Sequence, residues 1–172
     1  LSTLTVMAAL SKTTNDTLPA SPLEHRRPDA KPLVLVAEDH EDTRFMLSYL
    51  LDLRGYQVVE AADGEEAVLL AGRLCPDLIL MDMSLPRLDG LAAMLRIRQL
   101  DALHYVPVVF LSGHAQPDIR AAALAKGGNE FLVKPLKLSE LEIAIERQLG
   151  EDCASRAGQQ SQERKDNYHE GF

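Results

Sequence analysis

The sequence has 172 residues, which is enough for one domain of ordinary size with extensions. Hydrophobic residues make up 46% of it, enough for a real core, and the formal net charge of −8 does not favour direct binding to nucleic acid. No apolar run reaches the roughly 18 residues that a membrane span needs, and Cys75 and Cys153 lie far apart without metal-ligand spacing. We therefore expect a cytoplasmic protein that contacts neither a membrane nor nucleic acid directly.

The two ends of the chain differ in composition from its middle. Residues 1–30 are rich in Ser, Thr, Asn and Pro without a sustained hydrophobic period, which predicts a flexible N-terminal arm. Residues 151–172 are polar and nearly free of aliphatic side chains, which predicts a disordered C-terminal tail. The folded domain is therefore expected over residues 31–150.

Strand and helix signals alternate five times along residues 31–150. The first strand is followed by a helical pattern that Gly55 closes. Later helices are indicated by Glu65 and Glu66 in a first turn, by Asp89 as a cap and by Pro117 at a first position. The strands are expected at 33–37, 56–61, 77–82, 106–112 and 130–134, and the helices at 45–53, 63–74, 89–100, 117–126 and 138–149.

The strands are short apolar runs rather than clean alternations of polar and apolar residues. This pattern is typical of a parallel sheet that is covered on both faces. Repeated strand–helix units predict an α/β fold with a doubly wound, five-stranded parallel sheet and helices on both faces. In such a fold, ligands bind at the carboxyl ends of the strands.

Polar side chains stand where four of these strands end. The first strand runs into Glu38 and Asp39, and Asp82, Ser112 and Lys134 end the third, fourth and fifth strands. Taken singly, an Asp after a strand is usually a cap or turn residue. Because the carboxyl ends of parallel strands share one edge, we expect all five groups to converge, and their order along the chain indicates a site.

Three close carboxylates repel one another and lose hydration when they are buried, so they need a cation. Oxygen ligands on a half-open edge suit a hard ion such as Mg²⁺. Such an ion neutralises phosphoryl oxygens while a carboxylate attacks, and a Lys and a hydroxyl hold the remaining oxygens. The sequence therefore predicts a site for phosphoryl transfer.

Four stretches, in order, resemble the receiver domain of two-component response regulators. They are AEDH, LILMDMSLPRLDG, FLSGHA and FLVKPL, and the resemblance spans about residues 32–149. It implies a flavodoxin-like sheet with strand order 2-1-3-4-5 and makes Asp82 the phosphoacceptor. For the metal, Mg²⁺ or Mn²⁺, it implies Asp39 as a direct ligand, Glu38 as a ligand through water, and the backbone carbonyl of Ser84 beside Asp82.

The same resemblance assigns roles around the phosphoryl group. Ser112 and Lys134 would bind phosphoryl oxygens, and the Lys134–Pro135 bond would be cis. Phe131 would be the aromatic residue that changes rotamer on activation, and we expect its ring to be about half covered beforehand.

The resemblance implies a signalling switch or phosphorelay intermediate and not an enzyme. The phosphoryl donor would be a sensor histidine kinase or a histidine phosphotransfer protein. Residues 151–172 are too short and polar for a DNA-binding module. We therefore expect the phosphorylated domain to signal by contact with a downstream protein or to relay the phosphate onward. The contact surface would consist of residues 117–126, strand 130–134 and the last helix. One alternative is a phosphohydrolase with an Asp nucleophile, although Ser84 stands where its second acid belongs. The other is a receiver-like scaffold that is never phosphorylated.

Overall fold

Strands and helices alternate along residues 31–114 and 116–150, which this computed structural model describes. The expected N-terminal arm, 1–30, and C-terminal tail, 151–172, lie outside the described residues. The strands are β1 (Leu33–Ala37), β2 (Gln57–Ala61), β3 (Leu78–Asp82), β4 (Val108–Ser112) and β5 (Glu130–Val133). The helices are α1 (Glu41–Leu53), α2 (Gly64–Leu74), α3 (Gly90–Ile97), the short 3₁₀ helix η2 (Asp101–Leu103), α4 (Pro117–Ala125) and the last helix, residues 138–150.

Side chains fix where α2, α3 and α4 begin, and two of them, Asp89 and Pro117, were predicted from the sequence. The side chain of Asp63 accepts hydrogen bonds from the backbone N–H groups of Glu65 and Glu66, both at 2.9 Å, and so caps α2. Asp89 caps α3 in the same way, and Pro117 occupies the first turn of α4. Local side-chain chemistry therefore sets where these helices begin.

Three predicted boundaries are wrong by two to four residues. Helix α1 begins at Glu41 rather than at residue 45, because its first turn is polar and carries no hydrophobic signal. Helix α3 ends at Ile97 rather than near Leu100, because the chain tightens and the N–H of Leu100 donates to the carbonyl of Ile97 at 3.0 Å. Strand β4 begins at Val108 rather than at residue 106, since Pro107 has no N–H to donate to a neighbouring strand.

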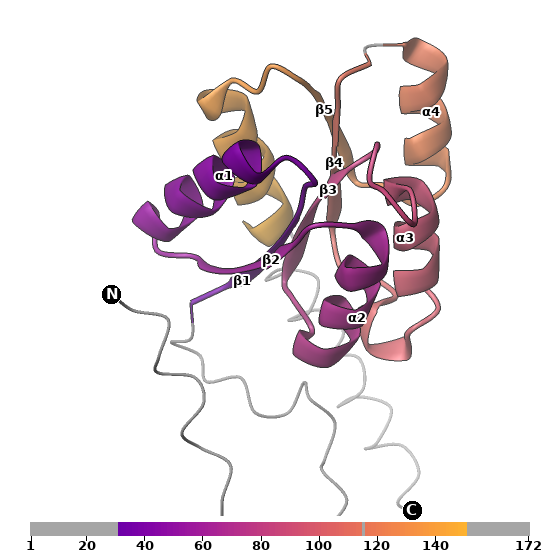
Figure 1. The fold of residues 1–172 in the computed structure, drawn as a ribbon, viewed down its shortest axis with the longest axis horizontal. Helices are drawn as coiled ribbons and strands as arrows, with labels where there is room; N and C mark the ends of the chain where they lie inside the picture. The colour runs from indigo at the N-terminus through magenta and orange to yellow at the C-terminus, as the bar shows by residue number, and fades with distance from the viewer. Residues whose placement is uncertain (1–30, 115, 151–172) are drawn as a thin grey trace, which may run out of the picture.

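All five strands are parallel and lie in the order β2-β1-β3-β4-β5. Helix α1 and the last helix cover one face of the sheet, while α2, α3 and α4 cover the other (Figure 1). The predicted doubly wound sheet, with its strand order 2-1-3-4-5 and helices on both faces, is therefore confirmed. Within the described ranges, no helix is both long and apolar enough to cross a membrane.

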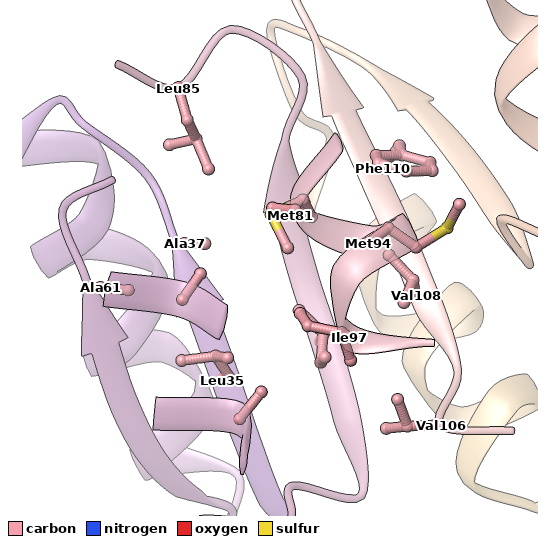
Figure 2. Close-up of a cluster of buried hydrophobic side chains, with 14 of the residues drawn as sticks. Leu35, Ala37, Ala61, Met81, Leu85, Met94, Ile97, Val106, Val108 and Phe110 are labelled. Atoms are coloured by element: carbon pink, nitrogen blue, oxygen red, sulfur yellow. The ribbon is translucent and has the colours of Figure 1, made fainter. Parts of the chain in front are cut away.

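Two hydrophobic clusters lie on opposite faces of the sheet, because successive residues of a strand point to opposite sides. In β1, Leu35 and Ala37 join the cluster under α2, α3 and α4, part of which is drawn in Figure 2. Val34 and Val36 join the cluster under α1 and the last helix. Burial on both faces explains why the strands read as continuous apolar runs.

The strand register aligns the polar residues that follow the strands. Ala37 of β1 pairs with Met81 of β3, so Glu38 lies one position further along, level with Asp82. Asp82 pairs with Leu111 of β4, and Ser112 pairs with Val133 of β5. The sheet therefore brings the predicted site residues to one edge.

Candidate phosphoryl-transfer site

The ammonium group of Lys134 joins the ends of three strands. Its Nζ donates hydrogen bonds to Oε2 of Glu38 at 2.6 Å and to Oδ2 of Asp82 at 2.5 Å. Both carboxylates are buried, whereas the Lys134 side chain is 24% exposed. Three residues that are far apart in the sequence thus form a connected charged cluster, in which one cation faces two anions.

The surroundings of Lys134 act on its pKa in opposite directions. Burial lowers the pKa, while the hydrogen bonds and charges of Asp82 and Glu38 raise it. The net result is a pKa above the ordinary value of 10.5, so the side chain is a cation at neutral pH. This charge offsets part of the cost of burying the two carboxylates.

Asp82 is held in place at the end of β3. Its Oδ1 accepts a hydrogen bond from the backbone N–H of Ser84 at 2.8 Å, which is the Asx-type turn expected of an Asp after a strand. The next residue, Met83, still donates to the carbonyl of Leu111 at 2.9 Å, which fixes the backbone beside it. One oxygen of the Asp82 carboxylate is therefore oriented by backbone and the other by Lys134.

Glu38, Asp39 and His40 offer three possible metal-ligand atoms, all within 4.8 Å of one another. Glu38 is buried, yet its Oε1 has no hydrogen-bond partner among the residues that the structure describes. The Asp39 side chain is 33% exposed, so the group opens toward solvent. An unpartnered buried carboxylate oxygen costs free energy, and oxygen donors at an open edge fit a hard divalent cation.

Ser112 reaches the same edge but bonds to its own loop. The side chain is buried, and its hydroxyl oxygen accepts from the backbone N–H of His114 at 3.1 Å. The hydroxyl also lies 3.3 Å from the carbonyl of His114, to which it donates. In this state the hydroxyl holds the β4–α4 loop, which is the ordinary structural role of a Ser after a strand.

The sequence profile of the response regulator receiver domain matches residues 34–146, well over half of the 172 residues. This chain belongs to the response regulator receiver domain family. The predicted resemblance is therefore confirmed, and the chain is a receiver domain of the two-component signalling class, whose members act as switches.

Curated relatives and solved structures agree with this membership. The transcriptional regulatory protein PdtaR of Mycobacterium tuberculosis is 41% identical over 114 residues, which cover 66% of this chain and 54% of PdtaR. PrrA of the same species is 39% identical over 114 residues, covering 66% of this chain and 48% of PrrA. This chain therefore spans about half the length of those regulators.

Among solved structures, the receiver domain of the sensor histidine kinase PA1611 from Pseudomonas aeruginosa is 36% identical, with a TM-score of 0.66. The match covers 70% of this chain and 99% of the PA1611 receiver domain. That structure has a magnesium ion coordinated in its active-site cleft.

Of two features predicted from the receiver resemblance, one is confirmed and one is wrong. The Lys134–Pro135 peptide bond is cis, as predicted. The expectation that the Phe131 ring is half covered is wrong, because Phe131 is only 3% exposed and belongs to the cluster under α2, α3 and α4. The β5 register places Phe131 beside Phe110 of β4, and both residues belong to the buried cluster that also includes Ala123 of α4.

Sequence reasoning missed two residues of the receiver site. Arg44 in α1 donates from Nη1 to the backbone carbonyls of Glu38, at 2.7 Å, and of Asp39, at 3.3 Å, and so fixes the backbone of the acidic pair. His40 lies directly beside that pair, with Nδ1 3.0 Å from Oδ1 of Asp39. The only sequence signal for either residue is its closeness to the acidic pair along the chain.

Proposed function

We propose that this receiver domain accepts a phosphoryl group on Asp82, with Mg²⁺ or Mn²⁺ present, from the phosphohistidine of a sensor histidine kinase or histidine phosphotransfer protein. The observation that carries the proposal is the cluster of Lys134, Glu38 and Asp82, in which a buried carboxylate at a strand end contacts a cation. Membership of the receiver family supports the same chemistry.

In the transfer, one oxygen of the Asp82 carboxylate attacks phosphorus. The bond between phosphorus and the imidazole nitrogen of the donor breaks, and its electron pair stays on that nitrogen. The hydrogen bond from the N–H of Ser84 orients the carboxylate before the attack. Lys134 then exchanges Asp82 for a phosphoryl oxygen, which places its positive charge where negative charge has arrived.

The residues present fit the metal that the family implies. Glu38, Asp39, Asp82 and the backbone carbonyl of Ser84 would hold the ion, and the unpartnered Oε1 of Glu38 supports this assignment. The bound ion supplies neutralisation of the negative charge on the phosphoryl oxygens. The magnesium ion in the PA1611 receiver domain is consistent with this role.

The phosphorylated state is passed on by protein contact, either to a downstream target or as onward phosphate relay. Ser112 exchanges the backbone of His114 for a phosphoryl oxygen and draws the following loop inward. The loop leads into α4, so the surface of α4, β5 and the last helix changes shape. Since Phe131 is already buried, an inward turn of its ring is not required for this change.

Incubation with acetyl phosphate and Mg²⁺, followed by intact-mass measurement and an assay for released phosphate, tests the proposal. We expect one phosphoryl group on the wild-type protein, none on Asp82→Asn, and none when the metal is chelated. Continuous release of phosphate at enzyme-like rates would instead indicate a hydrolase. A complete lack of labelling would indicate a scaffold.

A further inference from the structure

A cleft of about 400 Å³ lies at the edge of the sheet where the strands begin, opposite to the edge that carries the phosphoryl-transfer site. Its walls come from the end of α3, the segment before β4 and the turn between α4 and β5. This volume falls within the range of about 300–1,000 Å³ that is usual for small-molecule sites. The residues that line the cleft include Arg98, His104, Tyr105, Lys126, Gly127 and Asn129.

Two cations line the cleft and no carboxylate does, although the whole chain has a formal net charge of −8. Nη1 of Arg98 donates to the carbonyls of Leu103 and Val106, at 3.1 and 2.5 Å. Its Nη2 donates to the carbonyl of Gly127 at 3.1 Å and to Oδ1 of Asn129 at 3.3 Å. All four acceptors are neutral, and burial lowers the pKa of Arg98. The guanidinium is therefore held in place, but its positive charge is not neutralised.

Lys126 and Asn129 offer hydrogen-bond donors that are not in use. The exposed ammonium of Lys126, at the end of α4, has no partner among the residues that the structure describes. Oδ1 of Asn129 accepts from the N–H of Val108 at 3.0 Å as well as from Arg98, which fixes the orientation of the side-chain amide. The Nδ2 donors of that amide are unpaired within the described ranges. An anion with several oxygen atoms can accept from both groups.

An aromatic ring stands at the rim of the cleft. Tyr105 is 80% exposed, and its ring meets that of His104 edge to face, with ring centroids 4.7 Å apart. Nδ1 of His104 donates to the carbonyl of Arg98 at 3.1 Å, which holds the imidazole in place. The Tyr105 ring therefore has a fixed neighbour on one side, while most of its surface is free to stack on a planar group.

We propose that this cleft binds a nucleoside phosphate. The phosphate oxygens accept hydrogen bonds from Lys126 and Asn129, beside the positive charge of Arg98. The base stacks on the ring of Tyr105, and such stacking tolerates any base because every base has a flat face. The proposal does not depend on the proposed function, because the cleft shares no residue with the site at Asp82.

Titration of the ¹⁵N-labelled protein with adenosine monophosphate, in the presence of a chelator, tests the proposal through backbone amide shifts. We expect saturable shifts at Gly127 and Asn129. Lys126→Met is expected to weaken binding about tenfold, because a charge-assisted hydrogen bond is lost. Tyr105→Ala is expected to weaken it about fivefold, because the stacking surface is lost. Both side chains are exposed, so both variants are expected to fold normally.

Lys137→Met and Tyr49→Ala are the matched controls, because both side chains are exposed and lie outside the cleft. Neither change is expected to alter the affinity for adenosine monophosphate, and Asp82→Asn is expected to bind it as the wild type does. Inorganic phosphate and adenosine, titrated separately, are each expected to bind more weakly, since each makes only part of the contacts.

The proposal is overturned if Gly127 and Asn129 show no saturable shifts, or if Lys126→Met and Lys137→Met weaken binding equally. Phosphate that binds as tightly as adenosine monophosphate would mean a simple anion site, and the nucleotide assignment would be wrong. Loss of binding in Asp82→Asn would place the ligand at the phosphoryl-transfer site instead of the cleft.

Discussion

Replacing Lys134 with Met removes the cation that stands between two buried carboxylates while keeping most of the length and volume of its apolar stem. In the metal-free protein, Oε2 of Glu38 and Oδ2 of Asp82 then lose their ammonium partner, which lies at 2.6 and 2.5 Å. Their mutual repulsion and their burial remain. We therefore expect Lys134→Met to destabilise the metal-free protein and to increase the stabilisation that Mg²⁺ provides.

The size of the effect follows from the burial of the three groups. Removing one partner of a fully buried ion pair typically costs about 3–5 kcal/mol, because a charge is left uncompensated. Glu38 and Asp82 are buried, but Lys134 is 24% exposed and water reaches the cluster from its side. We therefore expect a loss of about 2–3 kcal/mol in the free energy of unfolding.

Urea unfolding in the presence of a chelator measures this loss, and Lys137→Met is the matched control. Lys137 pairs with Glu140 on the surface at 2.8 Å, where water screens the two charges, so losing this pair is expected to change the free energy of unfolding little. The double variant Glu38→Gln with Lys134→Met is expected to recover part of the loss, because one of the two repelling charges is gone. A loss for Lys134→Met no larger than that for Lys137→Met would refute the electrostatic reasoning.

Three further predictions concern the same edge of the sheet. Asp39→Ala is expected to weaken Mg²⁺ binding more than Glu38→Ala and to raise the metal-free melting temperature by relieving repulsion; a clear fall in that temperature would make Asp39 structural. Gly90→Ala would place a Cβ 2.1 Å from the backbone carbonyl oxygen of Asp82. Urea unfolding is therefore expected to show that the free energy of unfolding falls by about 3 kcal/mol. A fall below about 0.5 kcal/mol would contradict this close packing. Because the pKa of Lys134 is raised, its stabilisation is fully present below its unfolded value near 10.5 and is lost as pH rises through the higher folded value. The difference in melting temperature between the wild type and Lys134→Met should therefore shrink only above about pH 10.5, and shrinkage near neutral pH would contradict the ion pairing.

The fold follows from the sequence because local signals and hydrophobic pattern agree. The acidic first turn with Glu65 and Glu66, the cap residue Asp89 and the apolar runs of the strands predicted nearly every element. The error at the end of α3 arises because tertiary contacts decide where that helix stops. The guanidinium of Arg98, just after α3, donates to the carbonyls of Val106 and Gly127, so the end of that helix depends on segments distant in sequence. No periodicity within the helix carries that information.

The sequence predicts which residues form the site, but not which hydrogen bonds their side chains make. The order of residues along successive strands located Asp82 and Lys134, since a parallel sheet brings its strand ends together. Side-chain rotamers decide the rest, and the sequence does not give them. They make the ammonium of Lys134 the shared partner of two carboxylates, and they direct the Ser112 hydroxyl to its own loop. The coverage of Phe131 depends on how closely α4 packs on the sheet, which the sequence does not state.

Reductive trapping tests most directly whether Asp82 carries the phosphoryl group. Borohydride reduces an aspartyl phosphate to homoserine, so peptide mass spectrometry identifies the modified residue. After incubation with acetyl phosphate and Mg²⁺, homoserine is expected at position 82, and the signal should vanish when the metal is chelated. Homoserine at position 39 or at another acidic residue, with residue 82 unmodified, would show that Asp82 is not the phosphoacceptor.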